Sequence, residues 1–220
     1  MSFDVRGRHL LGDSSWSSKN TLLTLSGYQI DEAERIGQLC YGDMQYFPSS
    51  SKAAQTYFND FDAIAMTGSF RSWLNSPYVE SHQRDVAICY TAIAFPKAHD
   101  SNEHYYAMYK TLQRGIAPHI GGIDDDTSLA MDTQPYLEKL RSVGRLRKAF
   151  VTKQGYVCLG PAKAQLGDVV CVFSASELPW LLRPTGKRSY QLVGDVYIYK
   201  HMYRRLFEKE KHVLRKFVLE

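Results

Sequence analysis

The sequence predicts an α+β fold, with a leading strand, about four helices and then a small antiparallel β-barrel or curled sheet. Three observations support this prediction. A segment rich in β-forming residues lies near the start, at 21–30. Apolar residues then recur at steps of three and four, the helical period, up to residue 147. After Ala149, short β-type runs alternate with Gly and Pro, as in small all-β units.

Four helices are expected from the apolar periodicity. Pro77 and Pro135 each suit the first turn of a helix, and Gly68 suits the end of one. Gly115, Pro118 and two further glycines break the pattern before the last helix. The predicted helices cover residues 53–65, 77–95, 102–114 and 133–147.

Five short runs after the helices predict strands, punctuated by Gly155, Gly167 and Pro179. The last stretch, 203–220, fits either a helix or a closing strand. We therefore expect a mainly helical part with the leading strand at 1–148. A small β-barrel with a basic C-terminal tail follows at 149–220, and the two parts form one compact unit. The predicted strands cover residues 150–152, 156–159, 168–173, 180–183 and 190–197.

Composition is that of a globular protein. Of 220 residues, 44% are hydrophobic and 23% charged, which excludes wholesale disorder and fibres. The longest apolar stretch, 87–95, is far shorter than the roughly 20 residues needed to cross a bilayer. The first residues lack the apolar region of a secretory signal. The four cysteines lie far apart and form no C-x-x-C pair, so we expect a reducing cytoplasmic location.

Charge divides the chain unevenly. Residues 141–220 hold 16 Lys and Arg against 6 Asp and Glu, a net charge of +10, and residues 1–140 hold 11 against 17, a net −6. Either the two parts attract each other or the C-terminal part faces an acidic partner. The basic tail from Lys200 to Lys216, interleaved with Tyr and Phe, also admits nucleic-acid binding, which ranks last because acidic residues interrupt it.

Motifs for common chemistry are weak. Gly186–Ser189 resembles the end of a phosphate loop, but it lies between two β runs and reads as a hairpin turn. Asp124–Asp126 lacks the register of a calcium loop and reads as a solvated loop or a helix N-terminus. His99 and His104 provide too few convergent ligands for zinc. We expect no metal and no cofactor.

The C-terminal third resembles a known family. An ordered series of segments is similar to the closing region of fungal heterokaryon-incompatibility (HET) domain proteins, and residues 23–31 resemble the strand that opens the family's C-terminal half. The resemblance implies a fungal source and an interaction or regulatory module, and it transfers no enzyme activity. The segments are 150–161, 165–173, 178–184 and 190–198.

The chain departs from the family pattern in three places. The family's N-terminal HET domain is absent from these residues. Cys89–Ala92 stands where the family has Trp-Arg-Thr-Leu. Lys200–Arg205 replaces an acidic, glycine-containing turn by a basic one. Any role of those family residues is lost or changed here.

The sequence leaves two functional hypotheses. The first is a HET-like C-terminal module that binds a protein or an apolar small ligand at the seam between helices and barrel. The alternative is a free-standing, cofactor-independent enzyme of secondary metabolism, a cyclase or isomerase. In that alternative, His82 or Asp85 handles a proton, Arg183 holds an oxyanion, and Tyr90 and Tyr197 shape the cavity.

Overall fold

The structure of the protein is a computed structural model, which describes most of the chain. Asp124, His99, Cys40, Lys187 and the basic stretch 200–212 lie outside the described residues. The described residues are 15–17, 22–39, 51–66, 77–78, 80–95, 103–114, 125–174, 176, 178–186, 188–199 and 213–220.

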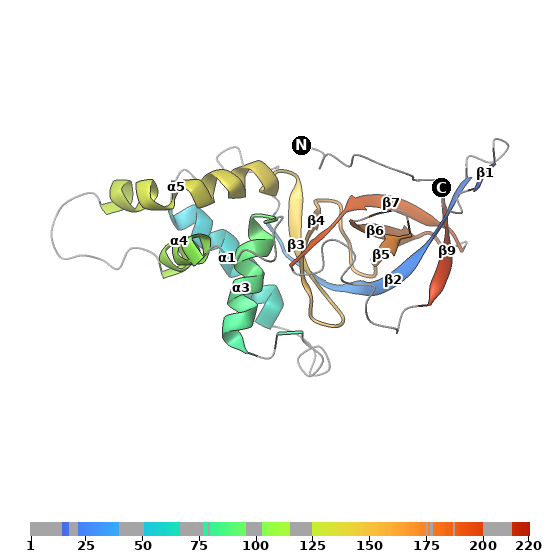
Figure 1. The fold of residues 1–220 in the computed structure, drawn as a ribbon, viewed down its shortest axis with the longest axis horizontal. Helices are drawn as coiled ribbons and strands as arrows, with labels where there is room; N and C mark the ends of the chain where they lie inside the picture. Colours follow the sequence, from blue (N-terminus) through green and yellow to red (C-terminus); the bar gives the residue numbers. More distant parts are fainter. Residues whose placement is uncertain are drawn as a thin grey trace.

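The described residues form four helices, which gather at one end of the molecule (Figure 1). Three of them agree with the sequence prediction to within a few residues. The prediction for the fourth was wrong at its start, because α5 begins eight residues earlier and encloses Pro135 instead of starting beside it. Asp125 and Asp126 are the first two residues of this helix. The helices are α1 (Ser51–Met66), α3 (Ser81–Ala92), α4 (Glu103–Arg114) and α5 (Asp125–Gly144).

The strands follow the order β5-β6-β7-β9-β2-β3-β4-β8, and β2 also pairs with β5, which closes five of them into a ring (Figure 1). The α+β prediction, with a leading strand and a curled, mostly antiparallel sheet, is confirmed. The strands are β1 (Ser15–Ser17), β2 (Leu22–Ile36), β3 (Arg147–Thr152), β4 (Val157–Pro161), β5 (Val169–Phe173), β6 (Pro179–Pro184), β7 (Tyr190–Asp195), β8 (Tyr197–Ile198) and β9 (Leu214–Leu219).

The leading strand and the chain end complete the ring together. β2 has 15 residues and pairs along its length with β9, β5 and β3. Its pairing with β9 is antiparallel, with Leu25 opposite Phe217. The ambiguous final stretch is therefore a strand where it is described. The strands of residues 149–220 form a closed ring only together with β2, which precedes all the helices in the sequence.

Helices and strands share one apolar core. The largest buried cluster joins residues of all four helices to β3, β4 and the residues around β8. Two smaller clusters lie among the strands, and alternate residues of β5 enter each of them. This explains why β5 reads as a continuous apolar run, since both of its faces are buried.

Apolar burial accounts for the junction of helices and strands. The ion pair Arg147–Asp195 joins β3 to β7, Lys153–Glu32 joins the turn after β3 to β2, and Lys110–Asp85 joins α4 to α3. The seam itself is packed with aromatic and aliphatic side chains.

Candidate functional site

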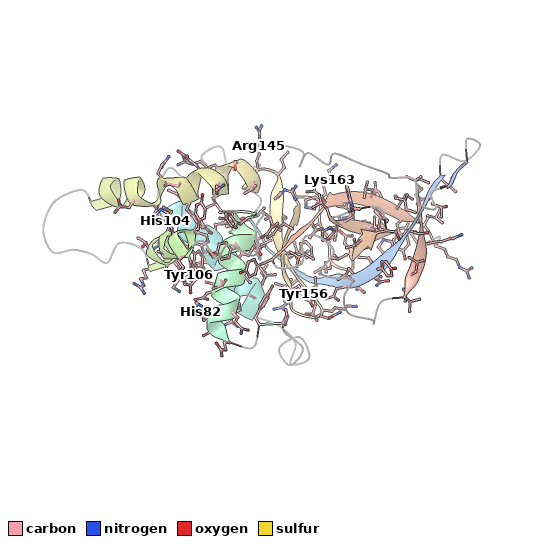
Figure 2. The ribbon with its side chains drawn as sticks, viewed as in Figure 1. His82, His104, Tyr106, Arg145, Tyr156 and Lys163 are labelled. Carbon is pink, nitrogen blue, oxygen red and sulfur yellow. The ribbon has the colours of Figure 1, made fainter. Side chains whose placement is uncertain are left out.

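A cleft of about 830 Å³ opens where α5 meets the strands. One wall is the last turn of α5 and the residues after it. The other is formed by the start of β3, the end of β4 and the end of β7. Figure 2 shows Arg145 at the end of α5, beside β3, directed outward. The lining residues are Arg141, Ser142, Val143, Arg145, Leu146, Arg147, Pro161, Val193, Gly194 and Asp195.

The helix wall ends in an unusual backbone conformation. Helix α5 stops at Gly144, and Leu146 then adopts a left-handed conformation with φ of 59°. Its carbonyl accepts a 2.8 Å hydrogen bond from the backbone N–H of Ala162, which ties the turn to the end of β4. A non-glycine residue in this region is strained, and such residues persist where surrounding contacts hold them. The turn also leaves the Leu146 side chain 60% exposed in the cleft.

The strand wall depends on a glycine and a bulge. Gly194 has φ of 153°, and a Cβ there would lie 2.6 Å from Cγ of Pro161. The pairing of β6 and β7 shifts register here, so Leu181 faces Gly194 while Leu182 faces Leu192. Val193 is the extra residue. Bulges of this kind re-aim side chains and are common beside binding sites.

The cleft carries excess positive charge. Arg147 donates from Nη2 to Oδ2 of Asp195 at 2.6 Å and from Nη1 to the Asp195 carbonyl at 3.2 Å. Arg145 is exposed, and in the described part of the chain no ion pair is found for it. The lining thus holds three arginines against one carboxylate, beside apolar side chains. This arrangement suits an anionic group attached to an apolar body.

Two of the residues predicted for the site lie in the seam but are buried. Tyr197 donates a 2.6 Å hydrogen bond to the carbonyl of Phe95, which joins β8 to the end of α3. Tyr90 stacks on Tyr199 with ring centroids 5.2 Å apart. Burial raises the pKa of Tyr90 to about 12. Their contacts pack the α3 side of the seam.

His82 and Asp85 lie on α3 and contact α4. His82 Nδ1 lies 3.1 Å from the hydroxyl of Tyr106, with the two rings edge to face. Figure 2 shows both at this face of the helices. Asp85 Oδ2 accepts a 2.9 Å hydrogen bond from Lys110. These contacts hold the two helices together.

Arg183 lies on β6 and pairs with a buried carboxylate. Its Nε and Nη2 each donate to Asp168 at 2.9 Å, and Nη2 also donates to the carbonyl of Lys163 at 2.6 Å. Asp168 is only 1% exposed. The structure therefore brings Tyr90 and Tyr197 to the packed part of the seam, His82 and Asp85 to α4, and Arg183 to the loop before β5. None of the five lines the cleft.

Sequence reasoning missed the arginines of the cleft. A signal was present, because Arg141, Arg145 and Arg147 lie close together at the end of the last predicted helix, just before the first predicted strand of the β part. Within the described residues, no group of His, Cys, Asp or Glu could hold a metal ion. No helix among them is long and apolar enough to cross a membrane.

Comparison with known proteins shows which family has this fold. The family model of the Het-6 beta-barrel domain matches residues 94–219, more than half of the chain. The chain belongs to the Het-6 beta-barrel domain family. The resemblance to HET-like proteins is thereby confirmed, and the match includes α4, α5, most of the strands and every residue that lines the cleft.

A curated relative is the Heterokaryon incompatibility protein 6, OR allele, of Neurospora crassa. It is 35% identical over 54 residues, which are 23% of this chain and 8% of that protein. The matched segment thus spans a small part of the relative's length. No solved structure matches.

Proposed function

We propose that this chain is a HET-like binding module that takes a protein or small ligand at the cleft between α5 and the strands. The observation that supports it is the cleft itself. It lies at the junction of helices and strands, it measures about 830 Å³, and it combines arginines with apolar side chains. Volumes of this order are usual for ligand sites, and such sites favour junctions between structural units.

On the α3 side, the described residues of the seam are closely packed, which supports the same location. Tyr90, Tyr197 and Tyr199 are buried in the core shared by α3, β4 and β8. A ligand on that side would have to displace close-packed aromatic rings. On the α5 side the walls diverge and Leu146 is exposed to solvent.

A cytoplasmic location is part of the proposal. Cys89, Cys158 and Cys171 are free and buried. Burial raises the pKa of each thiol above its ordinary value, so each stays protonated and unreactive. Such cysteines suit a reducing compartment.

Methyl NMR tests the proposal without knowledge of the ligand. The protein, labelled at Val and Leu methyl groups, is mixed with protein and small-molecule fractions of a fungal extract. A ligand of the cleft shifts the signals of Val143, Leu146 and Val193 while leaving those of Leu166 and Leu214 unchanged. The two control residues are 66% and 53% exposed and do not line the cleft. Fractions that shift only the controls, or that leave all five signals unmoved, would refute the proposal.

A further inference from the structure

The last strand of the ring provides a second surface for binding, separate from the cleft. We propose that the open edge of β9, at residues 214–217, takes up an extended acidic segment of a partner protein as an added strand. This edge lies at the end of the molecule away from the helices, whereas the cleft lies where α5 meets the strands (Figure 1). The inference therefore goes beyond the proposed function and does not depend on it.

Strand pairing leaves one edge of β9 open. On one side, β9 pairs with β2 from Leu23 opposite Leu219 to Tyr28 opposite Leu214. On the other side, its pairing within the described strands is a single parallel rung to β7, Tyr190 opposite Leu219. That rung lies at the end of β9, and β7 runs on from it in the direction in which β9 ends. Residues 214–217 therefore have no strand of the described chain beside them on this edge.

The rung also shows which backbone groups face the open edge. The N–H of Glu220 donates a 3.0 Å hydrogen bond to the carbonyl of Tyr190, so the backbone N–H of Glu220 faces β7 and not β2. Because the N–H and C=O groups of successive strand residues alternate between the two edges, those of Leu214 and Lys216 face the same way. In the described chain these groups have no hydrogen-bond partner on that edge. An added strand would gain main-chain hydrogen bonds there.

The side chains at this edge combine apolar surface with positive charge. Val213 and Leu214 are 71% and 53% exposed, two neighbouring apolar residues where the strand begins. Lys216 is exposed, and no ion pair of it is found within the described ranges. Arg215 donates a 2.9 Å hydrogen bond to the neutral side chain of Gln29, which leaves its charge unbalanced. An extended segment that carries both carboxylates and apolar side chains matches this edge.

Charge favours an acidic partner over a second copy of the chain. Open edges can pair with identical edges, and lysine on an edge strand opposes this. Two copies of β9 paired antiparallel about Arg215 or Lys216 would place like charges directly opposite each other, which is destabilising. An acidic segment instead places a carboxylate opposite Lys216. The net charge of +10 on residues 141–220 also attracts such a segment from a distance.

Fluorescence anisotropy with the full chain tests the inference. The probe is a labelled peptide of about eight residues, a usual strand length, with two adjacent glutamates between valines and threonines. The comparison ligands are the same peptide with lysine for glutamate, a single-stranded oligonucleotide, and two forms of the glutamate peptide methylated on one or the other set of alternate backbone nitrogens. We expect the glutamate peptide to bind most tightly. One methylated form should bind about tenfold more weakly and the other almost unchanged, because only one set of N–H groups faces β9.

Charge reversal tests the contact with the edge. Lys216→Glu is expected to weaken the glutamate peptide about fivefold to tenfold. Lys163→Glu is the matched control, because Lys163 is exposed in the loop between β4 and β5. It makes the same change in net charge and should alter the affinity less than about twofold. Circular dichroism and a thermal melt confirm that each variant is folded.

Methyl NMR locates the peptide and separates the two proposals. The glutamate peptide should shift the signals of Val213 and Leu214 and leave the cleft residues unmoved. Leu166 belongs to neither surface and is the reference for both. A partner of the edge therefore moves Leu214 without Leu166, and a ligand of the cleft moves Leu146 without either. Either proposal can fail while the other holds.

Each alternative result has a definite meaning. Equal binding of the lysine peptide, or equal losses in Lys216→Glu and Lys163→Glu, overturns the acidic partner. Equal effects of the two methylations overturn strand addition. Oligonucleotide binding that depends on Lys216, or self-association of the chain through β9, overturns the inference if the peptide does not bind. Absence of peptide binding up to about 1 mM, or shifts at the cleft instead of Leu214, overturns it as well.

Discussion

Replacing Arg183 by methionine tests whether this residue serves the fold. The Asp168 carboxylate is 1% exposed and accepts three hydrogen bonds. Two come from Arg183 at 2.9 Å and one from the backbone N–H of Gln165 at 2.8 Å. Methionine keeps the apolar length of the side chain but removes both charged donors. A buried carboxylate is then left with one hydrogen bond.

The expected cost follows from that geometry. Removing one partner of a buried ion pair costs about 3–5 kcal/mol of unfolding free energy. Arg183 is itself 25% exposed, so we expect the lower value, about 3 kcal/mol. For a chain of this size that lowers Tm by about 6–12 °C. Urea denaturation and calorimetry measure both quantities.

Two further variants make the test specific. Arg183→Met combined with Asp168→Leu should lose less stability than the sum of the two single changes, because no buried charge is left alone. Arg188→Met is a control on an exposed arginine and should change stability by less than about 0.5 kcal/mol. A loss below about 1 kcal/mol in Arg183→Met, with strictly additive single changes, would refute the assignment.

Three further predictions concern stability. Tyr197→Phe removes the 2.6 Å hydrogen bond to the carbonyl of Phe95 and should cost about 1–2 kcal/mol in urea unfolding; an unchanged midpoint would show that the bond is not made. Gly194→Ala places a Cβ 2.6 Å from Pro161 at a positive φ and should cost about 1–3 kcal/mol by the same assay; a neutral result would contradict the close approach. Burial raises the pKa of Asp62, so the native state retains its proton more strongly, and the contribution of Asp62 to stability falls as pH rises above its ordinary pKa of about 4. Asp62→Asn should flatten that fall, and parallel pH curves for both proteins would count against it.

Much of the fold was predictable because local patterns decided it. Apolar residues at helical steps located α1, α3 and α4, and runs between glycines and prolines located the strands. The closing of the ring was not predictable, since it depends on β2 meeting β9 across nearly the whole chain. Such pairing leaves no local pattern, and the final strand also fits a helical face. The start of α5 was missed because Pro135 suits a first turn better than a helix interior.

The site was less predictable than the fold. The seam was expected, and Tyr90 and Tyr197 do lie in it, but sequence cannot show that their rings fill the space they were expected to line. Arg183 was expected to hold an oxyanion, and it holds the carboxylate of Asp168. The cleft arginines surround a turn whose shape depends on the left-handed Leu146 and on the approach of Gly194 to Pro161. Both are tertiary features. The enzyme alternative and the catalytic assignments of His82 and Asp85 stay hypotheses.

Crosslinking from within the cleft tests most directly whether it is the binding site. Leu146 is replaced by p-benzoylphenylalanine, and Leu166, which is 66% exposed outside the cleft, is replaced in the same way as a matched control. Both proteins are irradiated in fungal cells, and products are mapped by mass spectrometry. We predict a defined adduct from position 146 that Arg145→Glu reduces and that position 166 does not give. Identical adduct patterns from both positions, or none at position 146, would contradict the account.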